Sequence, residues 1–163
     1  MNHIQHTPPT HPGPHGKDGP AVPDPRAWRI VLPHTPAAVR LARALVRTAL
    51  AETGMPVDRD TAELLTAELV ANAVEHTCAD TPVELVVELP AEGCRVEVRD
   101  GDPCPPGDLS PRADDSHPDP WQEHGRGLLL VRALSSACGH RSTPEGKAVW
   151  FTLRPRQVLP ADV

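Results

Sequence analysis

The sequence predicts an α/β two-layer sandwich in which three helices cover one face of a mixed, mostly antiparallel sheet. Residues 58–77 repeat apolar side chains at the helical period. Residues 83–99 hold two alternating apolar and polar segments joined by a short loop, as in an antiparallel strand pair. A glycine turn at Gly125-Arg-Gly127 opens directly into an apolar segment of helical length. A chain of 163 residues has the length of one domain with a single core.

Composition narrows the partners that such a domain can have. Aromatic residues make up only 2% of the chain, so the core must consist mainly of Leu, Val and Ala. The net charge of −6 has the wrong sign for binding nucleic acid by counterion release, so we expect no nucleic-acid partner. No apolar run approaches the roughly 20 residues that cross a bilayer, and no signal-peptide core is present. We therefore expect a cytoplasmic protein without a membrane partner.

The cysteines and the chain ends show no metal or disulfide pattern. Cys78, Cys94, Cys104 and Cys138 include no C-x-x-C pair, so we expect reduced thiols, mostly buried as small hydrophobes. Seven prolines and a cluster of histidines lie within residues 1–25, which predicts a disordered tail. The folded domain is expected over 26–154, followed by a short polar tail over 155–163.

The first half of the domain is predicted to contain one strand and two helices. Residues 27–32 carry Trp, Ile, Val and Leu and predict a short strand. Pro36 suits a helix N-terminus, and Gly54 is a suitable C-cap for the same helix. The second helix is expected to begin at an Asp58 cap and to run to about Thr77.

The second helix combines an apolar stripe with a polar pair. The stripe consists of Ala62, Leu65, Leu69 and Ala73. Glu68 and Asn72 lie one turn apart, about 40° from each other around the axis, at one edge of this stripe. Leaving such groups desolvated and unpaired costs about 1–3 kcal/mol. Either a ligand or metal ion is their partner, or both side chains are simply solvated at the helix edge.

The strand pair that follows ends on an acidic residue. Residues 83–89 and 94–99 alternate around a loop at 90–93, which predicts a β-hairpin. Continuing the alternation puts Asp100 on the apolar face, where a carboxylate needs a hydrogen-bond donor. Alternatively, the strand ends at Arg99 and Asp100 opens a turn with Gly101.

The second half begins with an unusual segment. Residues 103–123 hold six prolines and five acidic residues, and so long a loop within a domain is either an active-site lid or disordered. The glycine turn at 125–127 then leads into a helix ending near Leu134. A helix start after glycines exposes backbone N–H groups that bind anions, although a plain loop-to-helix turn has the same sequence. Two strands, over 136–141 and 147–153, complete the sheet.

Four motifs in this order resemble those of the GHKL (histidine-kinase-like) ATPase family. They are Glu68-x-x-x-Asn72-Ala with His76, Asp100-x-Asp102, Gly125-Arg-Gly127-Leu128, and Gly146-Lys-Ala-Val-Trp150. In order and spacing they are most similar to those of the small anti-sigma-factor serine kinases common in actinobacteria. The resemblance covers residues 27–153 and implies the histidine-kinase-like ATPase fold.

The resemblance implies binding of ATP and Mg²⁺. Asn72 matches the asparagine that holds Mg²⁺ against the triphosphate, and Glu68 matches the proposed general base. Asp100 matches the aspartate that accepts a hydrogen bond from the adenine amino group. The other ATP-binding positions that it implies are His76, Asp102, Gly125, Arg126, Gly127 and Leu128. Residues 103–124 would form the ATP lid.

The chain also departs from the family pattern. Where relatives usually have Asp-x-Gly, it has Asp100-Gly101-Asp102, and where a Thr commonly assists the aspartate it has Ala148. These departures put nucleotide affinity and selectivity in question.

The resemblance supports two functions. One is a serine/threonine kinase that phosphorylates an anti-sigma antagonist and binds a sigma factor, with homodimerisation left open. The other is an ATP-binding regulatory module without phosphotransfer. A sensor histidine kinase is rejected, because residues 1–25 cannot form its helical phosphoacceptor segment.

Overall fold

The computed structural model describes residues 26–106 and 126–157. Its elements are β1 (Ala27–Leu32), α1 (Ala37–Thr53), α2 (Arg59–His76), β2 (Val83–Glu88), β3 (Cys94–Asp100), α3 (Arg126–Leu134), β4 (Ala137–Thr143) and β5 (Gly146–Leu153). The predicted N-terminal tail, residues 158–163 of the predicted C-terminal tail and residues 107–124 of the predicted lid lie outside the described residues, as does Gly125.

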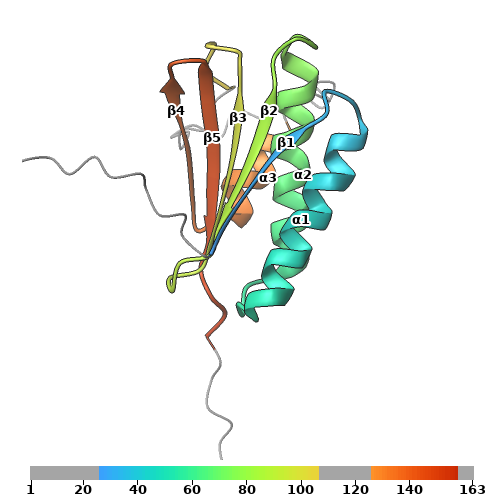
Figure 1. The fold of residues 1–163 in the computed structure, drawn as a ribbon. Helices are drawn as coiled ribbons and strands as arrows, with labels where there is room; N and C mark the ends of the chain where they lie inside the picture. The colour runs from blue at the N-terminus through green and yellow to red at the C-terminus, as the bar shows by residue number, and fades with distance from the viewer. Residues whose placement is uncertain (1–25, 107–125, 158–163) are drawn as a thin grey trace, which may run out of the picture.

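The five strands form one sheet in the order β1-β2-β3-β5-β4. The three helices lie on one side of this sheet, so the predicted two-layer sandwich is confirmed (Figure 1). One detail is corrected, because all four strand pairings in the described part of the chain are antiparallel rather than mixed. The last strand, β5, lies between β3 and β4, and this brings its first residues next to the end of β3.

Local chemistry sets the ends of the elements. Gly54 follows α1 with a left-handed φ of 63°, a backbone conformation in which glycine meets no Cβ penalty. Asp58 caps α2, because its Oδ1 accepts a hydrogen bond from Thr61 N at 3.0 Å. Gly93 closes the β2–β3 hairpin at a φ of 139°, where a Cβ would lie 2.0 Å from Leu153 O. The caps predicted at Gly54 and Asp58 are therefore both confirmed.

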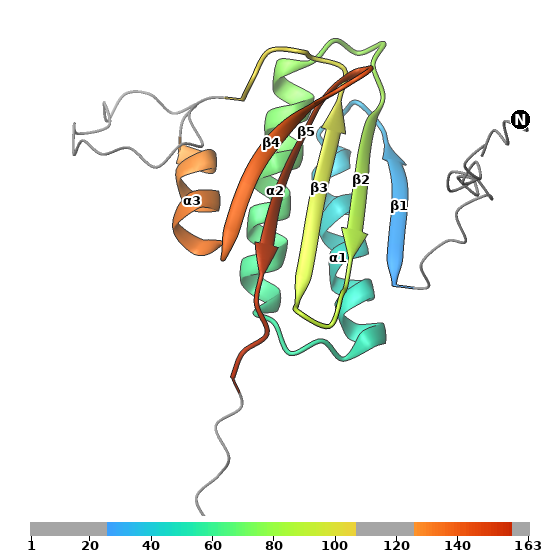
Figure 2. The same ribbon diagram turned by 90° about the vertical axis from the view of Figure 1, so that its left-hand side faces the viewer.

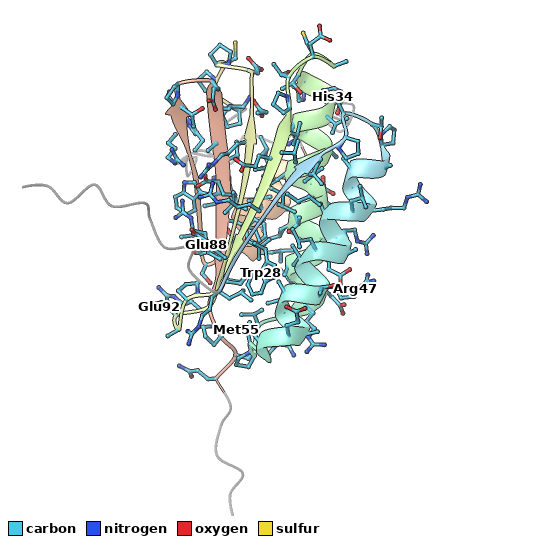
Figure 3. The ribbon with its side chains drawn as sticks, in the orientation of Figure 1. Trp28, His34, Arg47, Met55, Glu88 and Glu92 are labelled. Carbon is cyan, nitrogen blue, oxygen red and sulfur yellow. The ribbon has the colours of Figure 1, made fainter. Side chains whose placement is uncertain are left out.

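One hydrophobic core fills the space between the helices and the sheet. The predicted stripe of α2 faces it, and Phe151 on β5 is fully buried there. Trp28 and Met55 pack at its margin (Figure 3). The largest fully buried side chains, apart from Phe151, are Leu50, Leu65, Leu85, Leu89, Val46, Val70, Val83, Val87, Val96, Val98 and Val131. No helix among the described residues has both the length and the hydrophobicity needed to cross a membrane.

The four cysteines are free but differ in exposure. Cys94 is buried, and this burial raises the pKa of its thiol to about 12. Cys78 and Cys104 are exposed, so the expectation of mostly buried cysteines is wrong for these two.

The sheet face away from the helices carries an ionic cluster around Glu97, which is only 5% exposed. Its carboxylate accepts hydrogen bonds from Arg95 Nη2 at 3.1 Å, Arg99 Nε at 2.7 Å and Arg141 Nη2 at 2.8 Å. The Arg95 guanidinium also stacks 4.5 Å from the Trp150 ring. Burial alone would raise the pKa of Glu97, but the hydrogen bonds from Arg99 and Arg95 hold it below its ordinary value. The cluster therefore joins three neighbouring strands on this face.

Replacing Glu97 by Gln should destabilise the fold. Breaking a fully buried ion pair costs about 3–5 kcal/mol, and we expect about 1–3 kcal/mol here because the guanidiniums still reach water. A carboxylate with a lowered pKa stabilises the fold above its unfolded-state pKa, and this contribution is lost as the pH falls through its folded-state pKa. The difference between the two proteins in unfolding free energy, measured by urea denaturation, should therefore shrink below pH 4.5.

Glu88→Gln is the matched control on the same face. Glu88 lies 3.8 Å from Arg95 and its side chain is 47% exposed, so its replacement should change the unfolding free energy by less than about 0.5 kcal/mol. An equal loss in both variants would contradict a special role for Glu97.

Candidate functional site

Glu68 and Asn72 lie at the edge of the buried stripe of α2, as the sequence predicts. Both side chains are half-buried. The stripe itself is anchored in the core, and the Thr66 hydroxyl beside it donates a hydrogen bond to Ala62 O at 2.7 Å. Among the described residues, neither Glu68 nor Asn72 has a side-chain hydrogen bond or ion pair. An uncommitted carboxylate and amide, each partly withdrawn from water, are thus presented on one flank of α2.

The start of α3 lies directly against Glu68. Gly127 is the second residue of α3, and a Cβ added there would lie 2.4 Å from Glu68 Oε2 and 3.3 Å from its Cδ. Any side chain at this position would therefore displace the carboxylate. The first backbone N–H groups of a helix have no acceptor within the helix, so α3 brings such donors close to this flank of α2.

At the end of β3, Asp100 is 6% exposed and belongs to the strand. It is the register partner of Lys147, so both side chains lie on the helix-covered face. Lys147 Nζ donates a hydrogen bond to Asp100 Oδ1 at 3.0 Å, and the Asp102 backbone N–H donates to the same oxygen at 2.9 Å. Of the two placements that the sequence left open for Asp100, the structure has the one on the covered face.

Lys147 belongs to the Gly146–Trp150 motif, but no role was predicted for its side chain. It is 6% exposed, and besides Asp100 its Nζ contacts Asp102 O at 3.2 Å and Asp102 Oδ2 at 3.5 Å. The alternation of β5 could have identified Lys147, because Lys147 shares the face of Val149 and Phe151 in a strand antiparallel to β3. A lysine in an apolar series requires an acidic partner.

Ala148 lies on the other face of the sheet. It is fully buried and is the register partner of Arg99, whose side chain belongs to the Glu97 cluster. The substitution that the sequence analysis emphasised therefore does not reach Asp100. The side chain that does is the preceding one, Lys147.

Two glycines let three segments meet at this end of the sheet. A Cβ on Gly101 would lie 2.4 Å from Thr81 Cγ2, in the loop after α2. A Cβ on Gly146 would lie 2.2 Å from Asp100 O. Glycine is needed at both positions for this close approach of the segments around the Asp100–Lys147 pair.

The other residues predicted to bind ATP differ from one another in their surroundings. Asp102 is half-buried, and its pKa is lowered mainly by a hydrogen bond from Cys104 N at 2.9 Å and further by the charge of Lys147. His76 is exposed at the last residue of α2. Leu128 packs against the core. Arg126 is the first residue of α3.

The loop before α1 is tied to the C-terminal end of α2. His34 and Thr77 are joined by a hydrogen bond of 2.8 Å between Nε2 and Oγ1, and Figure 3 shows His34 beside this end of the helix. The end of α2, the end of β3, and the starts of α3 and β5 all lie in the upper part of Figure 2. The structure thus brings Gly127 against Glu68, and Asp102 beside Asp100.

The family model for the histidine kinase-like ATPase domain matches residues 32–153, which cover all the elements of the site. The chain belongs to the histidine kinase-like ATPase family. A comparison with curated proteins found no match. Membership confirms the GHKL resemblance at the level of the family and implies that the domain binds ATP.

The described residues fit ATP and Mg²⁺ in their chemistry. Asn72 offers an amide oxygen, a hard donor suited to Mg²⁺, and α3 offers backbone N–H groups to phosphates. No group of three or more His, Cys, Asp or Glu side chains within 26–106 and 126–157 could hold a metal ion. Mg²⁺ is commonly held by one or two protein oxygens together with water and substrate phosphates. The fit therefore rests on Asn72 and a bound triphosphate.

The contact between Gly127 and Glu68 can be tested by a double-mutant cycle. Alanine is preferred to glycine in a helix by about 0.5–1 kcal/mol, but in the wild type this gain is offset by displacement of the Glu68 carboxylate. In a Glu68→Ala background the clash is absent. Gly127→Ala should then be more favourable by at least about 0.5 kcal/mol in unfolding free energy than in the wild type.

Asn72→Ala provides the control background, because Asn72 lies one turn farther along α2. Gly127→Ala should have the same effect there as in the wild type. Equal effects in all three backgrounds would show that the glycine is not required by Glu68.

Proposed function

We propose that this histidine kinase-like ATPase is a serine/threonine protein kinase that uses ATP·Mg²⁺. The surroundings of Glu68 are the main support for this proposal. Its carboxylate is half-buried, has no partner among the described residues and lies in contact with the start of α3. A protein that only binds ATP has no need of a free carboxylate at this position.

Each part of the site has a role in this reaction. Asn72 holds Mg²⁺, which when bound neutralises charge on the phosphates. Asp100 accepts a hydrogen bond from the adenine amino group. Gly125 and Gly127 let the backbone approach the phosphates, where Arg126 adds positive charge. His76, Asp102 and Leu128 complete the proposed ATP contacts, and residues 103–124 act as the lid.

Glu68 acts as general base in the transfer step. Its carboxylate takes the proton of the attacking serine or threonine hydroxyl as the oxygen bonds to the γ-phosphorus, and the bond from that phosphorus to the bridging oxygen of ADP breaks. The products are ADP and a phosphorylated protein. Such a base acts mainly in the transition state, so its removal lowers the rate of transfer and leaves ATP affinity nearly intact.

The motif spacing supports the anti-sigma-factor kinase branch. In this proposal the phosphoacceptor is an anti-sigma antagonist, the second partner is a sigma factor, and all three act in the cytoplasm. A homodimer is compatible with these partners. Co-purification from the native cell, followed by identification of the captured proteins, tests the partners separately from the ATP chemistry.

The second candidate is an ATP-binding regulatory module without phosphotransfer. The departures of the chain from the family pattern at Asp102 and Ala148 favour it. Glu68 distinguishes the two candidates, since only the kinase depends on it.

Replacing Glu68 and Asn72 separately should give different losses. Asn72→Ala removes a metal ligand, so Mg²⁺-dependent affinity for ATP should fall together with transfer. Glu68→Ala should keep ATP affinity within about 2-fold and lower transfer by about 10²–10⁴-fold. Calorimetry measures the binding, and transfer of labelled γ-phosphate to a co-purified partner measures the reaction.

Glu52→Ala, at an exposed position of α1, is the control and should change neither quantity. If the wild type binds ATP·Mg²⁺ but transfers nothing, and Glu68→Ala alters neither binding nor partner capture, the kinase proposal is wrong and the regulatory module stands.

Asp100→Asn tests recognition of the base. The amide keeps the size of the side chain but removes the charge, so ATP affinity should fall by about 5–150-fold, the equivalent of about 1–3 kcal/mol. GTP has a carbonyl group at the corresponding position and should bind the wild type poorly. Equal calorimetric affinities of the wild type for ATP and GTP would remove Asp100 from this role.

A further inference from the structure

The ion pair between Lys147 and Asp100 is the most deeply buried one outside the Glu97 cluster in the described part of the chain. Each residue is 6% exposed. Withdrawing a charge from water costs several kcal/mol unless partners replace the lost hydration. The three oxygens around Lys147 Nζ are Asp100 Oδ1 at 3.0 Å, Asp102 O at 3.2 Å and Asp102 Oδ2 at 3.5 Å. An ammonium group has three donors, so the protein itself satisfies Lys147.

The two oxygens of the Asp100 carboxylate are used differently. Oδ1 accepts from Lys147 Nζ and from Asp102 N, which fills its two lone pairs. Among the described residues, no hydrogen bond reaches Oδ2. Lys147 therefore determines which carboxylate oxygen stays available to a ligand.

The plane of the carboxylate cannot rotate without losing contacts. Rotating it would break hydrogen bonds to Lys147 and Asp102 in a buried setting, and each unmade bond there costs about 1–3 kcal/mol. The surrounding segments approach closely, because a Cβ at Gly146 would lie 2.2 Å from Asp100 O and one at Gly101 would lie 2.4 Å from Thr81 Cγ2. One orientation of Asp100 is thus imposed before any ligand arrives.

We propose that Lys147 is the positioning residue for nucleobase selection, holding Asp100 so that Oδ2 is a fixed, charged hydrogen-bond acceptor. This acceptor selects a purine with an amino donor at position 6 and rejects one with a carbonyl there. The Lys147 ammonium neutralises one of the two negative charges of Asp100 and Asp102. One net negative charge therefore remains near the ligand. The inference rests on the proposed ATP binding and adds to it the source of selectivity.

Lys147→Met removes the ammonium and keeps the length and most of the volume of the side chain. Asp100 then loses its tether to β5, and the plane of its carboxylate can rotate away from the ligand. The ratio of dissociation constants for ITP and ATP, two nucleotides that differ at position 6, should fall at least about 10-fold from its wild-type value. Lys147→Arg, which keeps a cation, should restore most of the ratio.

Two measurements separate this effect from a general loss of stability or charge. Thermal unfolding shows whether each variant is folded, and loss of structure alone would weaken both nucleotides equally and leave the ratio unchanged. Arg29→Met removes a positive charge from the exposed edge strand β1 and should leave the ratio at its wild-type value.

A crystal structure of the wild-type protein with ADP tests the same proposal without any variant. The contact of Lys147 Nζ with Asp100 Oδ1 should persist, with the adenine amino group on Oδ2. If Nζ leaves Asp100 for the nucleotide, or if folded Lys147→Met keeps the wild-type ratio, the inference is wrong while ATP binding stands. If the wild-type protein binds none of these nucleotides, the proposed function itself fails.

Discussion

The packing of α2 onto the sheet is the interaction on which the rest of the structure depends. Its stripe of two alanines and two leucines is buried against β-strand side chains, and the alanines let the helix lie close to the sheet. Together with Glu63, Thr66 and Val70, the stripe forms one buried side of α2, and this fixes the rotation of the helix about its axis. That rotation leaves Glu68 and Asn72 half-buried at the margin and puts Glu68 against Gly127. The chemistry of the site is therefore a consequence of core packing.

Strands β3 and β5 carry two ionic systems on opposite faces of the sheet, because the side chains of alternate residues point to opposite faces. On the outer face, Glu97 is enclosed by three guanidiniums that connect neighbouring strands. On the helix-covered face, Asp100 has one cation and retains an oxygen without a partner among the described residues. A carboxylate whose acceptors are all used holds strands together, whereas one with an acceptor left over can bind a ligand. The number of donors around each acid separates the structural one from the candidate functional one.

Features that depend on local sequence were predicted well, and those that depend on strand register were not. The caps at Gly54 and Asp58, the stripe of α2 and the β2–β3 hairpin follow from neighbouring residues, and the structure confirms them. The partner of Asp100 comes from a strand 47 residues later in the chain. Without the register between β3 and β5, only the family resemblance pointed to a position beside Asp100, that of Ala148, which lies on the other face of the sheet one residue from Lys147.

The two ends of the candidate site depend on α2 through different glycines. At the phosphate end, Gly127 meets the Glu68 carboxylate, which is the far end of a flexible side chain and can move aside. At the base end, Gly101 meets the β-branched Thr81 just beyond α2, and Gly146 meets backbone, so neither neighbour can yield cheaply. The segments at the base end are therefore held in closer contact than Gly127 and the flexible Glu68 side chain. In the proposed function, affinity for the base and the rate of transfer depend on these different contacts, so we expect substitutions to change one without the other.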